Sequence, residues 1–187
     1  MKKVFFLAFI ISSCSSIKNI EEQKNDINII LNNWHNAAAN ANFTDYFNVL
    51  SPNAVYIGTD ATENWTKPEF EAFAKPYFDK GKAWSFTCLE RNIYFSNDKK
   101  TAWFDELLNT QMKICRGSGI LIYSNGNWKI SHYVLSMTIP NDNTNEVIKI
   151  KSDTIRINDI DNITTKYKNY YGTRFTEIRK EIGRAHV

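Results

Sequence analysis

Residues 101–139 read TAWFDELLNTQMKICRGSGILIYSNGNWKISHYVLSMTI, and over most of this length apolar and polar side chains alternate. A period of two is typical of strands that bury one face, because successive side chains in a strand point to opposite sides. Asn125-Gly126 is a signal for a tight hairpin turn. The sequence therefore predicts consecutive antiparallel strands at 101–108, 114–124 and 128–139.

The alternation begins before this stretch. Residues 83–89 and 92–96 alternate in the same way, and Ser96-Asn97-Asp98 supplies a turn signal before the next strand. The chain from Lys82 to Ile139 is therefore expected to form a long antiparallel meander.

The chain before Lys82 has a helical period instead. A short helical piece is predicted over 43–50 and a short strand over 54–58. An amphipathic helix is predicted over 24–41, because apolar side chains recur there at helical spacing, at Ile27, Ile30, Leu31, Trp34, Ala38 and Ala41. Helices followed by strands indicate an α+β fold in which a curved antiparallel sheet is wrapped around N-terminal helices.

A further helix is predicted to begin at Thr66-Lys67-Pro68-Glu69, which has the pattern of a capping box with proline in the first turn. The helix continues through Phe70, Phe73 and Ala74. Pro76 lacks the amide hydrogen that a helix interior needs, so we expect it to break or kink this helix, and we expect Gly81 to end it.

The composition is that of one globular domain with a short extension. The chain has 187 residues, 43% of them hydrophobic and 23% charged, with seven glycines and four prolines, which excludes collagen, a disordered tail protein and a multi-span membrane protein. Aromatic residues make up 14%, so one core can bury enough apolar area without metals or disulfides. Three cysteines are too few for a disulfide scaffold.

The N-terminal segment has the features of a secretory signal. Lys2 and Lys3 precede an apolar run, residues 4–11, that is too short to span a bilayer. Ile11-Ser12-Ser13-Cys14 resembles a bacterial lipobox, so we expect a signal peptide at 1–13, lipidation of Cys14 and a tether at 14–23. The protein is then expected in the cell envelope, lipid-anchored and periplasmic or associated with the outer membrane. The alternative is an ordinary secretory signal with an incidental Cys14.

The last residues of the sequence have a different origin. Residues 181–187 back-translate to a widely used sequencing-library adapter, so 182–187 are interpreted as read-through from an insert. Without 1–13 and 182–187 the chain has 20 basic and 20 acidic side chains. A neutral chain with no basic stripe does not suggest nucleic acid or an anionic membrane surface as a partner.

Three stretches are similar to the SnoaL-like branch of the nuclear transport factor 2-like superfamily. They are Tyr56 to Trp65 (YIGTDATENW), Trp103 to Glu106 (WFDE) and Cys115 to Gly119 (CRGSG), and the resemblance covers residues 24–140. It implies a cone of sheet and helices whose open end is a ligand pocket. The superfamily includes isomerases, cyclases, dehydratases and binding modules without catalysis, so the resemblance indicates the fold more strongly than an activity. Residues 141–181 match nothing in it, and a disordered tail, a partner-binding extension and out-of-frame translation are all open.

The period of two predicts which side chains point into such a cone. If Trp128 and Ile130 point inward, the residues on the same face of that strand are His132, Val134 and Ser136. On the neighbouring strand, one face carries Arg116, Ser118 and Ile120. On the strand after that, one face carries Trp103, Asp105 and Leu107. Asp105 as a general base, with His132 or Arg116 as its electrostatic partner, would suit proton abstraction next to a carbonyl. The alternative is structural, with Arg116 neutralising Asp105 in a buried pair and His132 completing the hydrogen bonds of a strand end.

Other candidate residues follow from the resemblance or from chemistry. Trp34, Tyr46, Tyr56 and Trp65 are expected to line the pocket. His35 is interpreted as a boundary residue that touches solvent. Asp60 and Glu63 either hold a cation at the rim or mark the entry of a helix. No His-x-x-x-His or Cys-x-x-Cys pattern occurs, so no metal and no cofactor is expected. Cys88 and Cys115 are expected to be two buried thiols rather than a disulfide.

Three functional hypotheses follow. The leading one is a cell-envelope domain that binds a small, mostly apolar molecule in a cone-shaped pocket. The second is an isomerase-like or dehydratase-like acid–base enzyme that uses Asp105 and His132. The third is a non-enzymatic interaction module, because sheets of this superfamily often pair face to face as homodimers.

Overall fold

The computed structural model describes residues 19–151. The predicted signal peptide, Cys14 and residues 182–187, which were interpreted as adapter read-through, lie outside the described residues. The helices are α1 (Ile20–Ala39), α2 (Phe43–Asn48), α3 (Lys67–Asp79), the 3-10 helix η1 (Asn141–Asn143) and α4 (Thr144–Lys151). The strands are β1 (Leu50–Ile57), β2 (Asn64–Thr66), β3 (Thr87–Phe95), β4 (Thr101–Thr110), β5 (Lys113–Ser124) and β6 (Asn127–Met137).

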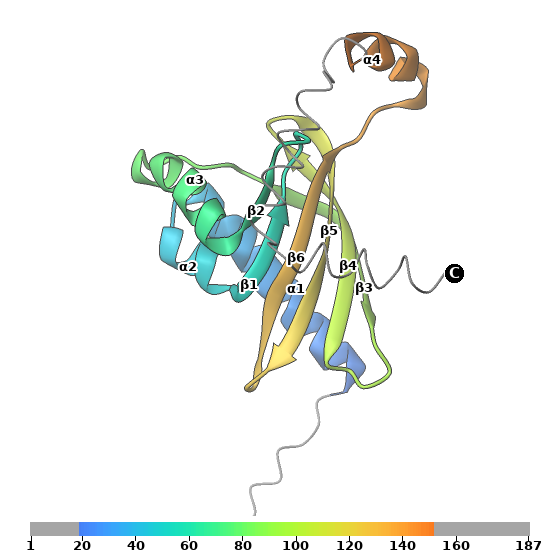
Figure 1. Ribbon diagram of the computed structural model, residues 1–187. Coiled ribbons are helices and arrows are strands. Elements are labelled where there is room, and N and C mark those ends of the chain that lie inside the picture. The colour runs from blue at the N-terminus through green and yellow to red at the C-terminus, as the bar shows by residue number, and fades with distance from the viewer. Residues whose placement is uncertain (1–18, 152–187) are drawn as a thin grey trace, which may run out of the picture.

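The α+β class is confirmed, and the sheet is mixed rather than wholly antiparallel. Its strand order is β2-β1-β6-β5-β4-β3, with β1 parallel to β6 and every other pair antiparallel. The meander from β3 to β6 returns the chain beside β1 in the same direction, which sequence periodicity cannot reveal. Helices α1, α2 and α3 lie on one side of the twisted sheet, and α4 stands apart beyond the end of β6 (Figure 1).

Helix α1 begins at Ile20, four residues before the predicted start. Asn19 and Glu22 form a capping box, in which the Glu22 amide donates to Asn19 Oδ1 at 2.9 Å and the Asn19 amide donates to Glu22 Oε2 at 3.0 Å. The predicted apolar stripe is buried at Ile27, Leu31, Trp34 and Ala38. Part of the predicted tether, 14–23, is therefore the first turn of the helix that covers the sheet.

Helix α3 continues through Pro76, so the predicted break does not occur there. Its start is as predicted, with Thr66 and Glu69 forming the capping box. Phe70 and Ala74 before the proline and Phe78 after it are all buried on one face of the helix. Burial on both sides of Pro76 offsets the loss of one backbone hydrogen bond.

The strand bounds differ from the sequence pattern at several places. Strand β1 begins at Leu50 rather than at residue 54. The two predicted segments 83–89 and 92–96 are replaced by one strand, β3, with a register shift between Cys88 and Glu90. The short strand β2, which pairs Trp65 with Tyr56, was not predicted. Residues 141–151, left without an assignment by the sequence, form η1 and α4.

An aromatic core fills the space between the helices and the sheet. Its largest fully buried rings include Trp34, Tyr46, Phe70 and Tyr133. Trp34 meets Tyr133 edge to face with ring centroids 4.8 Å apart, and Tyr56 stacks on Phe70 at 3.9 Å. No helix in the described part of the chain is long and apolar enough to cross a membrane.

Both cysteines of the described part are free thiols rather than a disulfide, as predicted, but only Cys115 is buried, and Cys88 is half-buried. Cys88 on β3 and Cys115 on β5 pair with Leu108 of β4 from opposite sides. Two strand spacings, about 10 Å, separate them, which is beyond the reach of a disulfide.

Candidate functional site

The strands of the meander turn one face toward the helices and the other away from them; we call these the inner and the outer face. On β4 the inner face carries Phe104, Glu106 and Leu108. On β5 it carries Cys115, Gly117, Gly119 and Leu121, and on β6 Tyr133 and Leu135. The residues between them, which were predicted to point into the cone, are on the outer face.

The prediction that Asp105, Arg116 and His132 converge inside the cone is wrong. Cross-strand pairing does place them on a common face, because Asp105 lies opposite Ser118, Arg116 opposite Ser136, and Ile120 opposite both Trp103 and His132. That face is the outer one, where Trp103, Arg116 and Ser136 are exposed. Within residues 19–151 no hydrogen bond or ion pair joins Asp105, Arg116 and His132; Asp105 accepts from Asn92 Nδ2 at 3.1 Å.

A β-bulge explains the error on β6. Trp128 and Ile130 are buried, as expected. Ile120 pairs with His132 and the next residue, Leu121, pairs with Ile130, so Ser131 has no partner on β5. One extra residue reverses the alternation, which turns Tyr133 inward and His132 outward. On β4, each of the two sets of alternate residues in WFDELL contains one acidic and two apolar side chains. The alternation alone therefore could not predict whether Asp105 or Glu106 points inward.

Glu106 lies at the centre of a buried charged cluster, the Glu106 cluster, made up of Glu106, His35, Arg91 and Tyr133. His35 Nε2 lies 2.9 Å from Glu106 Oε1, and the Tyr133 hydroxyl donates to the same oxygen at 3.1 Å. Arg91 donates to Oε2 through Nε at 2.9 Å and through Nη2 at 2.7 Å. Each carboxylate oxygen thus takes part in two hydrogen bonds, and the Glu106 side chain has no exposed surface.

The cluster joins α1 to the sheet. Arg91 of β3 also donates from Nη1 to Asn28 Oδ1 at 3.1 Å and to Asn32 Oδ1 at 3.0 Å. Asn28, Asn32 and His35 follow one another at helical spacing on α1. One side of the helix is therefore connected through polar contacts to β3, β4 and β6.

The electrostatics of the cluster favour an ionised Glu106. Burial alone would raise the pKa of Glu106, but the hydrogen bond with His35, the electrostatic interaction with His35 and the charge of Arg91 together lower it below its ordinary value of 4.5. Burial, followed by the charge of Glu106, raises the pKa of Tyr133 well above 10.0, so its phenol keeps the proton that it donates.

Sequence reasoning missed Glu106 and misplaced His35. His35 was interpreted as touching solvent, whereas it is only 4% exposed. The usable signal was the position of His35 four residues after Leu31, at the edge of the apolar stripe. A second signal was Gly117 on the neighbouring strand, because a glycine inside a strand often marks the close approach of another group. In the structure, a Cβ at Gly117 would lie 2.2 Å from the Tyr133 hydroxyl and 2.9 Å from Glu106 Oε1.

A pocket of about 120 Å³, the mouth pocket, opens between the β1–β2 turn, α3 and the β4–β5 turn. The walls are mostly aromatic, and the polar lining is Thr59, Glu63 and Gln111. The full lining is Tyr56, Gly58, Thr59, Glu63, Trp65, Phe70, Phe73, Trp84, Phe86, Gln111, Met112 and Leu135.

The predicted pocket residues fall into three groups. Tyr56 and Trp65 lie in the wall of the mouth pocket. Trp34 and Tyr46 are each 1% exposed and belong to the packed core. The remaining four are on the outer face of the sheet, namely Trp103, Arg116, Ser118 and Ser136.

The mouth pocket and the Glu106 cluster are separate. None of the four cluster residues lines the pocket. Tyr56 lies between them, with its ring 5.4 Å from that of Tyr133, and Phe86 of the pocket wall lies 5.9 Å from the ring of His35. Among residues 19–151 no group of three or more His, Cys, Asp and Glu side chains could hold a metal ion.

Replacing Glu106 by Gln tests the structural role of the cluster. We expect E106Q to lower the free energy of unfolding at neutral pH by about 3–5 kcal/mol, because an amide cannot satisfy four donors and leaves Arg91 buried without its counter-charge. Urea denaturation measures this loss. The matched control is Asp105→Asn on the outer face, which should change stability by less than about 0.5 kcal/mol.

The same variant carries a pH signature. Folding lowers the pKa of Glu106. The ionised carboxylate therefore contributes fully to the free energy of unfolding above pH 4.5, and this contribution is lost as the pH falls through the folded-state pKa. The wild type should therefore lose stability more steeply than E106Q below pH 4.5. Equal losses for E106Q and D105N, or parallel pH profiles for E106Q and the wild type, would contradict the assignment.

Comparison with known proteins agrees with this architecture. Residues 27–140 match the model of the SnoaL-like domain. No curated protein matches the chain. Among solved structures, an NTF2-like protein of unknown function from Pseudomonas putida KT2440 has a TM-score of 0.56 at 11% identity, over 65% of this chain and 91% of that one.

Two further structures show how varied such relatives are. A candidate dehydratase of the NTF2-like family from Streptomyces avermitilis has a TM-score of 0.57 at 8% identity, over 65% of this chain and 100% of that one. The association domain of C. elegans CaMKII has a TM-score of 0.52 at 19% identity, over 63% of this chain and 97% of that one. At these identities the likeness shows the NTF2-like fold alone. The match over residues 27–140, on a sheet and helices of this topology, makes the chain a member of the SnoaL-like domain family.

Proposed function

We propose that this domain binds a small, mostly apolar molecule in the mouth pocket. The observation that carries the proposal is the pocket itself, an opening of about 120 Å³ walled mostly by aromatic side chains, in which Thr59, Glu63 and Gln111 are the polar non-aromatic residues of the described lining. A cavity of about 150 Å³ with apolar walls is known to accept benzene, so this volume suits a single ring or a short alkyl group.

The acid–base alternative has little support from the described geometry. Asp105 and His132 are on the outer face, away from any shared hollow. Glu106 and His35 are the buried acid and imidazole, but they are at most 4% exposed and Glu106 is fully hydrogen-bonded within the protein. A group that catalyses proton transfer must reach its substrate, so the Glu106 cluster is better suited to holding the fold together.

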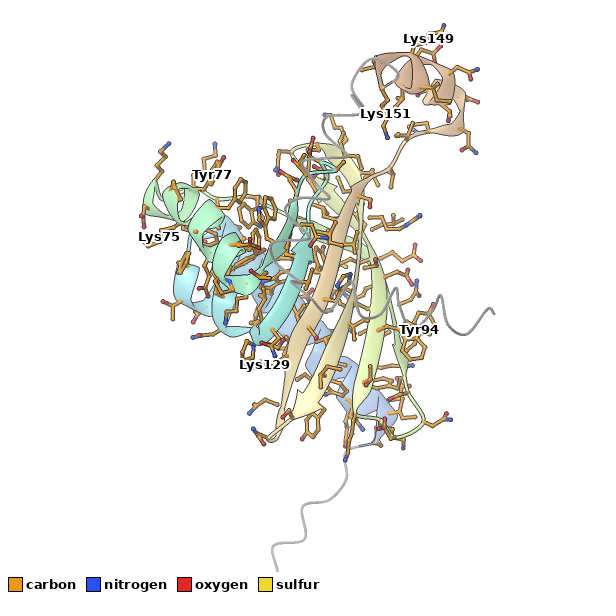
Figure 2. All side chains as sticks on the ribbon, in the orientation of Figure 1. Lys75, Tyr77, Tyr94, Lys129, Lys149 and Lys151 are labelled. Carbon is orange, nitrogen blue, oxygen red and sulfur yellow. The ribbon has the colours of Figure 1, made fainter. Side chains whose placement is uncertain are left out.

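A second candidate function, pairing of two copies through the outer face, is favoured by one observation. Tyr94, Trp103, Ile120 and His132 occupy matching positions on β3, β4, β5 and β6 and form one row across the sheet. Tyr94 and Trp103 stack with centroids 5.9 Å apart, and each is 45% exposed. Figure 2 shows Tyr94 on the side of the molecule away from α2 and α3. Exposed aromatic rows of this kind favour a protein interface.

A lipid anchor at Cys14 would place the domain in the cell envelope. This proposal depends on the sequence Ile11-Ser12-Ser13-Cys14 and on the apolar run before it. Helix α1 begins at Ile20, so only a few residues would separate the lipid from the folded domain. The membrane would then be a partner through the lipid alone, with no contribution from a basic surface.

Truncating Phe73 tests ligand binding. Phe73 lines the pocket, stacks on Trp65 at 4.5 Å and is 38% exposed, so F73A should weaken binding of a single-ring probe such as toluene by about tenfold while the core stays intact. Calorimetric titration measures the affinity. The control is Tyr94→Ala on the outer face, which should bind as the wild type does; a wild type that shows no saturable binding ends the proposal.

Placing a charge in the outer row tests pairing. If two copies meet there, Trp103→Lys should convert a dimer to a monomer, because the interface would bury an unpaired ammonium group. Sedimentation equilibrium distinguishes the two states. Tyr77→Lys on α3, equally exposed but off the sheet, should leave the dimer unchanged (Figure 2). A monomeric wild type removes this candidate.

Replacing Cys14 tests the anchor. In a bacterial host, Cys14→Ser should move the protein from the membrane fraction to the soluble fraction and abolish incorporation of labelled fatty acid, because the serine hydroxyl cannot form the thioether. Cys88→Ser, on β3, is the control and should remain in the membrane fraction. Unchanged fractionation and labelling of C14S would contradict the lipobox.

A further inference from the structure

The mouth pocket contains one carboxylate and no cationic side chain among its described lining residues. Glu63 supplies the carboxylate, at the turn between β1 and β2. Lysine, arginine and histidine are absent from the lining. The formal charge of the wall is therefore negative, and nothing in the wall neutralises it.

The aromatic walls, like the carboxylate, favour a positively charged ligand. Six of the lining residues are rings, namely Tyr56, Trp65, Phe70, Phe73, Trp84 and Phe86. Five pairs of these rings are stacked, including Trp65 on Phe73 at 4.5 Å and Trp65 on Phe70 at 5.5 Å. The face of an aromatic ring carries partial negative charge and attracts cations within about 6 Å of its centroid.

The carboxylate of Glu63 is held in place by the turn. The Asp60 amide donates to Glu63 Oε2 at 3.1 Å, and the Gly58 amide donates to the Glu63 carbonyl oxygen at 2.8 Å. Gly58 leaves room for the carboxylate, since a Cβ at that position would lie 2.2 Å from Glu63 Oε2. The position is therefore set before any ligand arrives, which lowers the entropic cost of binding.

Glu63 is also close to the rings. Tyr56 pairs with Trp65 across the β1–β2 hairpin, and both residues line the same pocket as Glu63. Burial, followed by the charge of Glu63, raises the pKa of Tyr56. A ligand seated against Tyr56 and Trp65 would therefore have its polar end within reach of Glu63.

We infer that the ligand of the mouth pocket is an organic cation of about single-ring size, a primary amine or a quaternary ammonium compound. This inference rests on the proposed function, because it names the chemical class bound at the same site. A cation is attracted by both the carboxylate and the ring faces, in addition to burying its apolar surface. A neutral molecule of the same shape is stabilised by apolar burial alone. An anion of that size is repelled by both.

The test compares three probes of nearly equal size: benzylamine, benzyl alcohol and benzoate. Calorimetric titration at low ionic strength, where charge effects are least screened, gives the three affinities. Fluorescence of Trp65 and Trp84 in the pocket wall provides a second readout. We expect benzylamine to bind about tenfold more tightly than benzyl alcohol and benzoate not to bind.

A matched pair of variants assigns the preference to Glu63. Glu63→Gln keeps an oxygen that can accept from the Asp60 amide, so the turn is preserved while one negative charge is removed. In E63Q, benzylamine and benzyl alcohol should bind about equally. Glu71→Gln on α3 removes the same charge outside the pocket, from a surface pair with Lys67, and should keep the tenfold preference.

The outcomes separate this inference from the proposed function. If benzyl alcohol binds as tightly as benzylamine to the wild type, the cation inference is overturned and apolar binding stands. If none of the three probes binds, the proposed function fails and the inference fails with it. A preference that persists in E63Q overturns the role of Glu63. The wild-type comparison needs no variant, so a misfolded E63Q does not affect it.

Discussion

A carboxylate at the interface between α1 and the sheet constrains the whole domain. Moving one ionised carboxylate out of water costs several kcal/mol, and attraction to its partners repays this only when every oxygen is hydrogen-bonded in good geometry. Glu106 meets that condition through His35, Arg91 and Tyr133, which come from α1, β3 and β6. The helix must therefore lie at one register on the sheet, because a shift by one turn would remove His35 from Glu106 and both asparagines of α1 from Arg91.

The backbone has to make room for this arrangement. Gly117 on β5 has no side chain where the Tyr133 hydroxyl and Glu106 meet, and a Cβ there would lie 2.2 Å from that hydroxyl. Gly119 leaves space in the same way for the ring of Phe104, which a Cβ would approach to 2.8 Å. These two glycines let large side chains of the neighbouring strands lie across β5, which closes the floor of the cone. The mouth pocket opens at one end of this packed interior, and a separate hollow lies between α1 and β3.

The domain has two acidic side chains in contrasting environments. Glu106 is sealed in the core with four hydrogen bonds, while Glu63 lies at the rim of an aromatic pocket with no cationic neighbour among the described lining residues. The first is suited to hold elements together and the second to recognise a ligand. The outer face, with its row from Tyr94 to His132, is a separate surface, so ligand binding and pairing of two copies can be altered independently.

The sequence by itself determined the class of fold and most of its elements. The capping box at Thr66, the apolar stripe of α1 and the period of two after Lys82 are local patterns, and local sterics and hydrogen bonding are enough to produce them. The resemblance that identified the fold covers nearly the same residues as the family match, 27–140. What only the tertiary structure decided was which side of each strand faces the core. Asp105 and Glu106 are neighbours with the same chemistry, and only packing against α1 selected Glu106. One unpaired residue, Ser131, reversed the alternation on β6 and sent His132 outward. The parallel pairing of β1 with β6 joins residues about eighty positions apart, and a side chain's neighbours at that separation are set by how the whole sheet closes rather than by any pattern along the chain.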